Sequence, residues 1–148
     1  MAKTGLRLLA QDEEDLSILS AHLQDAVIRV GDMAFMPRAH RFALLLNRYL
    51  WEDDPDAKNA GLRMRCGLHF EGVLKAKAHK VRQGSPDAIL EFLAIKYTPG
   101  EDGAGAIDLC LAGGGRIRLE VECIDATLSD MGGPWPAQAR PIHDLERR

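Results

Sequence analysis

The second half of the chain alternates apolar and polar residues with the period of β-strands. Four such segments follow one another, at residues 68–81, 88–97, 107–111 and 117–128. Successive side chains of a strand point to opposite faces, so an apolar residue at every second position predicts one buried face. Short polar or glycine-rich segments separate the four, at residues 83–87, 99–105 and 113–115. The pattern predicts an antiparallel meander.

The last of these segments changes its apolar phase by one residue. Apolar residues at Ile117, Leu119 and Val121 are followed by others at Ile124, Ala126 and Leu128. A β-bulge produces such a slip, because it inserts one extra residue and bends the strand. The alternative is that residues 123–130 begin a C-terminal helix.

The N-terminal part of the chain has the period of a helix. Leu16, Leu19, Leu23 and Val27 recur at three- and four-residue spacing, which gives one apolar stripe. Asp12 precedes them as a candidate N-cap, and three carboxylates follow it in the first turn, where the helix dipole favours negative charge. We therefore expect an amphipathic helix over residues 12–25, preceded by a short strand at residues 6–10.

A hairpin is expected between this helix and the meander. Residues 26–36 form its first strand, Pro37 lies in the turn at residues 37–40, and residues 41–51 return. Proline cannot donate to a sheet ladder, so it punctuates the two strands. An acidic loop follows at residues 52–59.

One helix and about six or seven strands predict an α+β fold. In this fold one N-terminal amphipathic helix packs in a curled, largely antiparallel sheet. A pleckstrin-homology-like or other small barrel is the concrete version that we expect. The length of 148 residues fits a single domain, with an irregular proline-rich C-terminal tail from about residue 131.

Composition bears on compartment and on the class of partner. A net charge of −3 argues against nucleic acid as the partner, because binding of that kind normally needs a basic excess. No apolar run approaches the roughly 18 residues that span a bilayer, and the N-terminus has no signal-peptide pattern. The three cysteines lack a CxxC spacing, which is typical of free thiols in a reducing interior. We expect a cytoplasmic protein that binds no membrane.

Few residues suggest catalysis. His22 and Asp25 are three positions apart on the predicted helix, where a carboxylate can orient an imidazole for proton transfer. The structural alternative is a simple pairing near the helix C-terminus, where a cationic histidine is favourable. Because no nucleophile is placed to join this pair, we assign no catalytic residue. The five histidines show no paired ligand spacing, so we expect neither a metal nor another cofactor.

A basic row is expected on the first strand of the meander. Lys75, Lys77 and His79 alternate with smaller residues and therefore share one face. Such a row could bind an anionic ligand or an RNA backbone. It could equally be a solvated face, or a charged edge that discourages aggregation.

A second candidate surface combines arginine and tryptophan. Arg48 interrupts an apolar row, Glu120 and Glu122 lie on the polar face of the last strand, and Trp51 and Trp135 end strands. If these strand ends meet, Arg48 pairs with one of the glutamates beside an indole. Such a pair is either a structural ion pair or a docking patch, since arginine and tryptophan are enriched where proteins dock.

Four sequence blocks resemble a known family. They are HLQDAVIRVGDMAF at residues 22–35, RFALLLNRYLWE at 41–52, GLHFEGVL at 67–74 and GGGRIRLEVECIDATLSDMGGPW at 113–135. Together they are similar to an alphaproteobacterial family of domains of unknown function, number 2948. The resemblance spans nearly the whole chain and implies a small single-domain cytoplasmic protein. It supplies no catalytic residues.

Two classes of function follow from these observations. The first is a non-catalytic binding or accessory module that acts on a protein partner or a small ligand. Its variant is a binder of anionic ligands or RNA through Lys75, Lys77 and His79. The second class is an enzyme of unfamiliar type that uses His22, Asp25 and nearby acidic residues.

Overall fold

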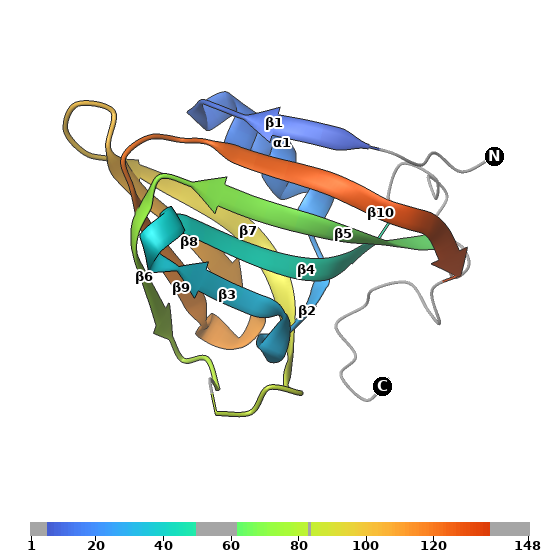
Figure 1. Cartoon of the computed structure of the whole chain (residues 1–148). Helices are drawn as coiled ribbons and strands as arrows, with labels where there is room; N and C mark the ends of the chain where they lie inside the picture. The colour runs from blue at the N-terminus through green and yellow to red at the C-terminus, as the bar shows by residue number, and fades with distance from the viewer. Residues whose placement is uncertain (1–5, 50–61, 83, 137–148) are drawn as a thin grey trace.

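A computed structural model describes residues 6–49, 62–82 and 84–136 of the chain. Figure 1 shows the helix beside a strongly curled sheet. The helix is α1 (Glu13–Leu23), and the first strands are β1 (Arg7–Ala10), β2 (Val27–Arg29), β3 (Met33–Met36) and β4 (Arg41–Tyr49). They are followed by β5 (Leu62–Glu71), β6 (Val73–His79), β7 (Ile89–Pro99), β8 (Gly105–Leu111), β9 (Arg116–Val121) and β10 (Ala126–Pro136).

The ten strands found in the described residues form one antiparallel sheet that does not close. Its order is β1-β10-β5-β4-β2-β7-β8-β9-β6, and β3 adds to β4 beside β2. In Figure 1, β10, β5, β4 and β3 lie side by side in front of β7, β8 and β9. The short strand β2 joins the two halves, because it pairs with both β4 and β7. The fold is thus mostly β with one helix, and the broad α+β prediction is confirmed.

The predicted number of six or seven strands is wrong, because three predicted strands each turn a corner. Residues 26–36 are divided into β2 and β3 by a 3₁₀ turn at Val30–Asp32. Gly72, with a φ of 68°, separates β5 from β6. Residues 122–125 separate β9 from β10. At residues 30–32 and at Gly72 the apolar pattern continues through the corner, so the sequence does not reveal it. The corner at residues 122–125 shifts the apolar phase, for which we expected a bulge.

The corner at residues 122–125 explains the slip of apolar phase near the C-terminus. It is neither a bulge within one strand nor the start of a helix, so both expectations are wrong. The chain leaves β9, which pairs with β6 and β8, and enters β10, which pairs with β5 and β1. Strand β10 continues to Pro136 with a register shift between Met131 and Trp135, rather than ending near residue 131.

The predicted meander is only partly correct. Strands β7, β8 and β9 are joined by hairpins, as the sequence pattern indicates. Strand β6, however, pairs with β9 rather than with β7, the next strand along the chain. This order, in which three hairpin strands are flanked by a fourth beside the last, is a Greek-key arrangement. It places β6 at an end of the sheet.

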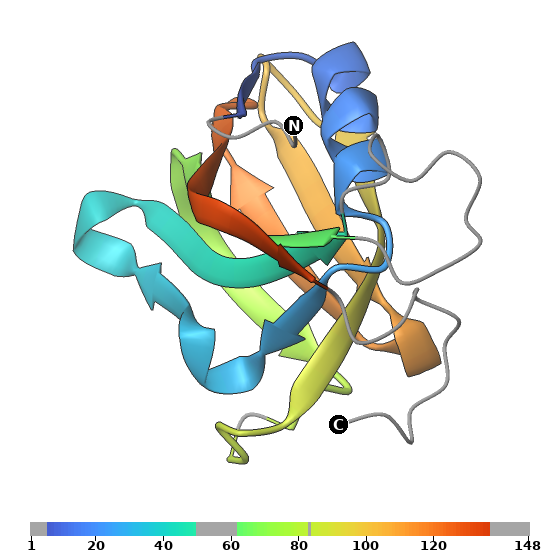
Figure 2. The same ribbon diagram turned by 90° about the vertical axis from the view of Figure 1, so that its right-hand side faces the viewer.

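The helix forms where the sequence predicts it. Asp12 is its N-cap, and the Asp12 carboxylate accepts a hydrogen bond of 2.8 Å from the Asp15 amide. Leu16, Leu19 and Leu23 are buried, and the helix packs mainly on β7 and also against β1 and β4. Figure 2 shows it alongside one side of the curled sheet. The apolar stripe therefore covers the core on the side where β1 and β7 do not pair with each other.

One contact fixes the helix to an irregular point of the sheet. The register between β7 and β8 shifts between Phe92 and Ala94, so Leu93 is bulged outward. Beyond the bulge, the Ile95 amide donates to the Ser20 hydroxyl of α1 at 3.0 Å. The helix hydroxyl thus provides a hydrogen-bond partner for a strand amide next to the bulge.

Candidate functional site

A regular array of polar side chains covers the outer face of β6, β9, β8 and β7. Strand register defines three rows across these four strands. The rows are Lys75–Glu120–Ala106–Thr98, Lys77–Arg118–Asp108–Lys96 and His79–Arg116–Cys110–Ala94. The residues between the rows, among them Leu119, Ile117, Ile107 and Leu109, are buried in the core. We call these twelve positions the basic face.

The sign of the charge on this face is opposite to that of the whole chain. Five of its side chains are lysine or arginine and two are acidic, a balance of +3 with His79 neutral. The chain as a whole carries −3, so the remainder carries −6. Positive charge is therefore concentrated on one sheet surface, where it creates a local field that attracts anions.

Only part of this charge is neutralised within the protein. Arg118 forms a bidentate pair with Asp108, with nitrogen–oxygen distances of 2.9 and 2.8 Å. This hydrogen-bonded pairing lowers the pKa of Asp108 and raises that of Arg118. The other four cations form no ion pair with any described residue; they are Lys75, Lys77, Lys96 and Arg116, and all are exposed.

A bulge sets which residues of β6 belong to the face. The register with β9 shifts between Val73 and Lys75, so Val73 is buried while Lys75 points outward. From there on, Lys75, Lys77 and His79 alternate with Ala76 and Ala78, as the sequence predicts for the three basic residues.

A cleft adjoins the basic face on the other side of β6. It has a volume of about 260 Å³ and lies between β6 and the β3–β4 hairpin. Its lining is mostly apolar and includes Phe35, Phe42, Ala76, Ala78 and Val81. Lys77 also borders it, so one side chain belongs both to the cleft and to the basic face.

The sequence did not point to four of the seven charged residues of the face. Arg116, Arg118, Lys96 and Asp108 come from three strands and join the predicted row only through strand order. The alternation of arginine and apolar residues at 116–119 was a usable signal, because it marks one polar face of a strand. Placing that face beside Lys77 required knowing that β6 pairs with β9.

The prediction that Arg48 pairs with Glu120 or Glu122 is wrong. Arg48 instead binds Asp130 of β10, with 3.0 Å between each of two guanidinium nitrogens and a carboxylate oxygen. Its side chain is 1% exposed and that of Asp130 is 0% exposed. The physical reason is strand order: β4 and β10 flank β5, whereas Glu120 lies in β9, paired with β6 and β8.

The other residues of the predicted arginine–tryptophan patch are dispersed or not described. Glu120 belongs to the basic face, opposite Lys75. Glu122 lies at the corner after β9, where its amide donates to the carbonyl of Gly72. Trp51 lies outside the described residues, and for Trp135 only the backbone is described, paired in register with Arg63. The buried position of Arg48 makes it part of the interior rather than of a docking surface.

His22 and Asp25 differ in their surroundings. His22 is half-buried, and its Nδ1 lies 3.1 Å from the Ile18 carbonyl of its own helix. Asp25 is buried, has a φ of 66°, and donates its amide to the Phe92 carbonyl of β7. Its backbone thus ends the helix and starts the path into β2. In the structure, His22 contacts the backbone of its own helix, and Asp25 forms the turn after the helix.

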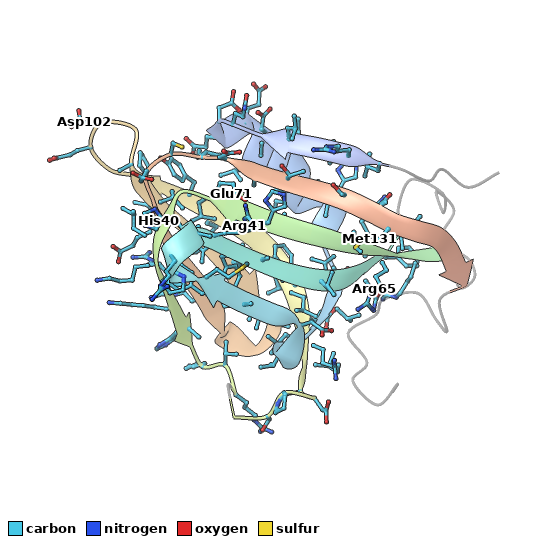
Figure 3. All side chains as sticks on the ribbon, in the orientation of Figure 1. His40, Arg41, Arg65, Glu71, Asp102 and Met131 are labelled. Atoms are coloured by element: carbon cyan, nitrogen blue, oxygen red, sulfur yellow. The ribbon has the colours of Figure 1, made fainter. Side chains whose placement is uncertain are left out.

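Carboxyl groups with lowered pKa values do not gather in one cavity. Asp32 is held by Arg29, and Asp108 by Arg118. For Glu71, burial opposes ionisation, but hydrogen bonds from Arg41 and His69, each 2.7 Å, outweigh it and lower the pKa. Figure 3 shows Arg41 and Glu71 close together on the front layer. Each shift follows from a separate surface ion pair, whereas an active site usually gathers such groups.

The described residues hold neither a metal-binding cluster nor a membrane-spanning helix. They contain no cluster of three or more histidine, cysteine or acidic residues arranged to hold a metal ion. Within the same ranges, no helix is long and apolar enough to cross a membrane.

Comparison with known protein families identifies the family of this chain. The model of a family described as protein of unknown function (DUF2948) matches residues 6–143. Neither the curated proteins nor the solved structures contain a match to this chain.

Proposed function

Since the chain belongs to the DUF2948 family, whose description names no activity, we propose its function from the geometry: a non-catalytic module that binds acidic segments of a protein partner. The basic face is the binding surface. The observation that carries the proposal is a balance of +3 on one sheet face of a chain whose net charge is −3. Complementary charge of this kind steers encounter and selects partners.

The chemistry of the face favours protein over nucleic acid as the partner. None of its twelve positions is phenylalanine, tyrosine or tryptophan, so it lacks the large rings on which bases usually stack. The rest of the chain is acidic and would repel a long polyanion. A short acidic peptide segment avoids that repulsion because it can be confined to the face.

The ion pair at the centre of the face supports a binding role. Arg118 is held by Asp108 in a bidentate geometry, whereas Lys77 and Lys96 flank this pair on either side without ion-pair partners of their own among the described residues. The Arg118–Asp108 pair is fixed, and the lysines on either side of it are available to a ligand. Carboxylates of a partner can therefore bind at several positions without movement of the sheet. The proposal places this interaction in the cytoplasm, a location supported by the three free cysteines.

A matched pair of charge reversals tests the proposal. The probe is a fluorescein-labelled peptide of eight glutamates, and its dissociation constant is measured by fluorescence anisotropy at low and physiological salt. Arg116→Glu changes an exposed residue of the basic face, and Arg7→Glu changes an exposed arginine of β1 that forms no ion pair with a described residue. Both variants alter the net charge equally.

We expect Arg116→Glu to weaken binding about tenfold and Arg7→Glu to leave it nearly unchanged, since close charges dominate once salt screens distant ones. Equal weakening by both variants would show that only net charge matters, and would overturn the proposal. Lys77→Glu adds a second control. This variant keeps a charge on β6. If the lysines only protect the strand edge from aggregation, that protection remains in the variant. If they form the binding surface, the variant loses binding of the glutamate peptide.

A further inference from the structure

Strand β6 has one edge without a partner strand. In the described part of the chain, β6 pairs only with β9, and β3 pairs only with β4. Figure 1 shows β3 and β6 next to each other, and the cleft of about 260 Å³ lies between them. An unpaired edge presents backbone N–H and C=O groups that can bind another extended chain.

The two faces of β6 next to this edge differ in chemistry. On one side, Lys75, Lys77 and His79 point to the basic face. On the other side, Ala76 and Ala78 lie opposite the buried Leu119 and Ile117 and line the cleft. Alanine fills little volume, so these two positions leave room for side chains that come from outside.

We propose that an extended segment of the partner adds to the free edge of β6 as an extra strand. Side chains of a strand alternate between its two faces, so the segment has acidic residues at every second position, facing Lys75 and Lys77. The residues between them are apolar and enter the cleft beside Ala76, Ala78 and Phe35. This inference rests on the proposed function and specifies both the binding mode and the sequence pattern of the partner.

Charge selects this occupant over a second copy of the same chain. Antiparallel pairing of two β6 edges would bring the lysines and histidines of the two copies close to each other. Like charges opposite one another on neighbouring strands are destabilising, whereas opposite charges stabilise the pair. An acidic extended segment can pair with the strand edge, place its apolar side chains in the cleft and bring its carboxylates to the basic row.

Three synthetic peptides separate this binding mode from simple attraction of charge. The first alternates valine and glutamate over eight residues, and the second has four valines followed by four glutamates. The third has the alternating sequence with every peptide nitrogen methylated, which removes the N–H donors needed for strand pairing. Each is labelled with fluorescein, and its dissociation constant is measured at neutral pH and physiological salt.

We expect the alternating peptide to bind at least about tenfold more tightly than either of the other two. Ala78→Phe, which fills the cleft from an exposed position, should abolish this advantage. The matched control is Ala112→Phe, which adds the same group at an exposed position in the 3₁₀ turn before β9. A thermal melt of each variant checks that it is folded.

The outcomes distinguish this inference from the proposed function. Equal, salt-dependent binding of the alternating and block peptides would overturn strand addition and leave the basic face as a binding surface. An alternating peptide that binds equally well to the Ala78→Phe variant would overturn the placement in the cleft. Failure of all three peptides to bind would overturn the inference, and the glutamate peptide with Arg116→Glu then decides the proposed function separately.

Discussion

At the scale of single residues, the structure changes the interpretation of Arg48 most. The sequence marks it correctly as unusual, because a charge interrupts an apolar strand. Its role depends on a partner 82 positions away, Asp130, which strand alternation cannot identify. Burial of an arginine requires an acidic partner, and β10 supplies one across β5.

Removing the acidic partner alone should be severely destabilising. Asp130→Leu leaves the guanidinium of Arg48 buried without its carboxylate, and we expect a loss of about 3–5 kcal/mol in the free energy of unfolding. Denaturant melts measure it. The double variant Arg48→Met/Asp130→Leu should recover part of that loss, since it removes both charges. A single variant as stable as the parent protein would show that this pair is not a buried ion pair.

The three thiols should differ sharply in reactivity. Cys66 is buried, and that burial raises its pKa to about 12, whereas Cys123 is exposed. The thiolate is the reactive form, so iodoacetamide at pH 8 should modify Cys123 first and Cys66 only after denaturation. Mass spectrometry of the native and denatured protein, without reduction, measures the order. Fewer than three reactive thiols after denaturation would contradict the assignment of free cysteines.

At the scale of elements, sequence periodicity identifies helices and strands better than it identifies the corners between strands. The helix is found within two residues at each end, because its leucine spacing and its N-cap are local features. Strands β7 and β8 are also recovered, because polar or glycine-rich turns flank them. The corner at Gly72 is missed, because it changes the direction of the chain without changing the alternation of apolar residues. The corner at residues 122–125 does change the alternation, but a bulge within one strand would give the same slip.

The apolar stripe of α1 and the apolar row of β9 should be about equally sensitive to loss of side-chain volume. Leu19 is 1% exposed and Leu119 is 0% exposed, each at the centre of its apolar row. We expect Leu19→Ala and Leu119→Ala to cost about 2–5 kcal/mol each. Ile18→Ala is the control on the same helix, because Ile18 is 49% exposed. Nearly neutral denaturant melts for either leucine variant would contradict the packing of helix and sheet around one core.

The hairpin between β7 and β8 requires a glycine at its base. A Cβ at Gly105 would lie 2.6 Å from both the Thr98 carbonyl oxygen and the Tyr97 hydroxyl. We expect Gly105→Ala to lower the free energy of unfolding by about 1–3 kcal/mol. Gly84→Ala is the matched control, since a Cβ there meets nothing within 4 Å. Equal stability of the two variants would show that the hairpin relaxes around the added methyl group.

At the scale of the whole molecule, strand order creates the candidate site. The sequence predicts the basic row of β6 but not its neighbours, because β6 pairs with a strand that begins 37 residues after β6 ends. The sheet also stays open, unlike the small barrel that we expected, and this leaves one edge of β6 without a partner strand among the described residues. A close charge array and a free edge are therefore properties of the fold, and neither can be seen in any one segment.

The location of bound acidic peptide tests the central claim most directly. The measurement is a titration of ¹⁵N-labelled protein with the alternating valine–glutamate peptide, followed by assigned backbone amide shifts. The account predicts that the largest shifts lie in β6 and β9, around Lys77 and Arg118, with little change in α1. Shifts concentrated on α1 or on β10, or tighter binding by an eight-nucleotide oligouridine than by the peptide, would contradict it.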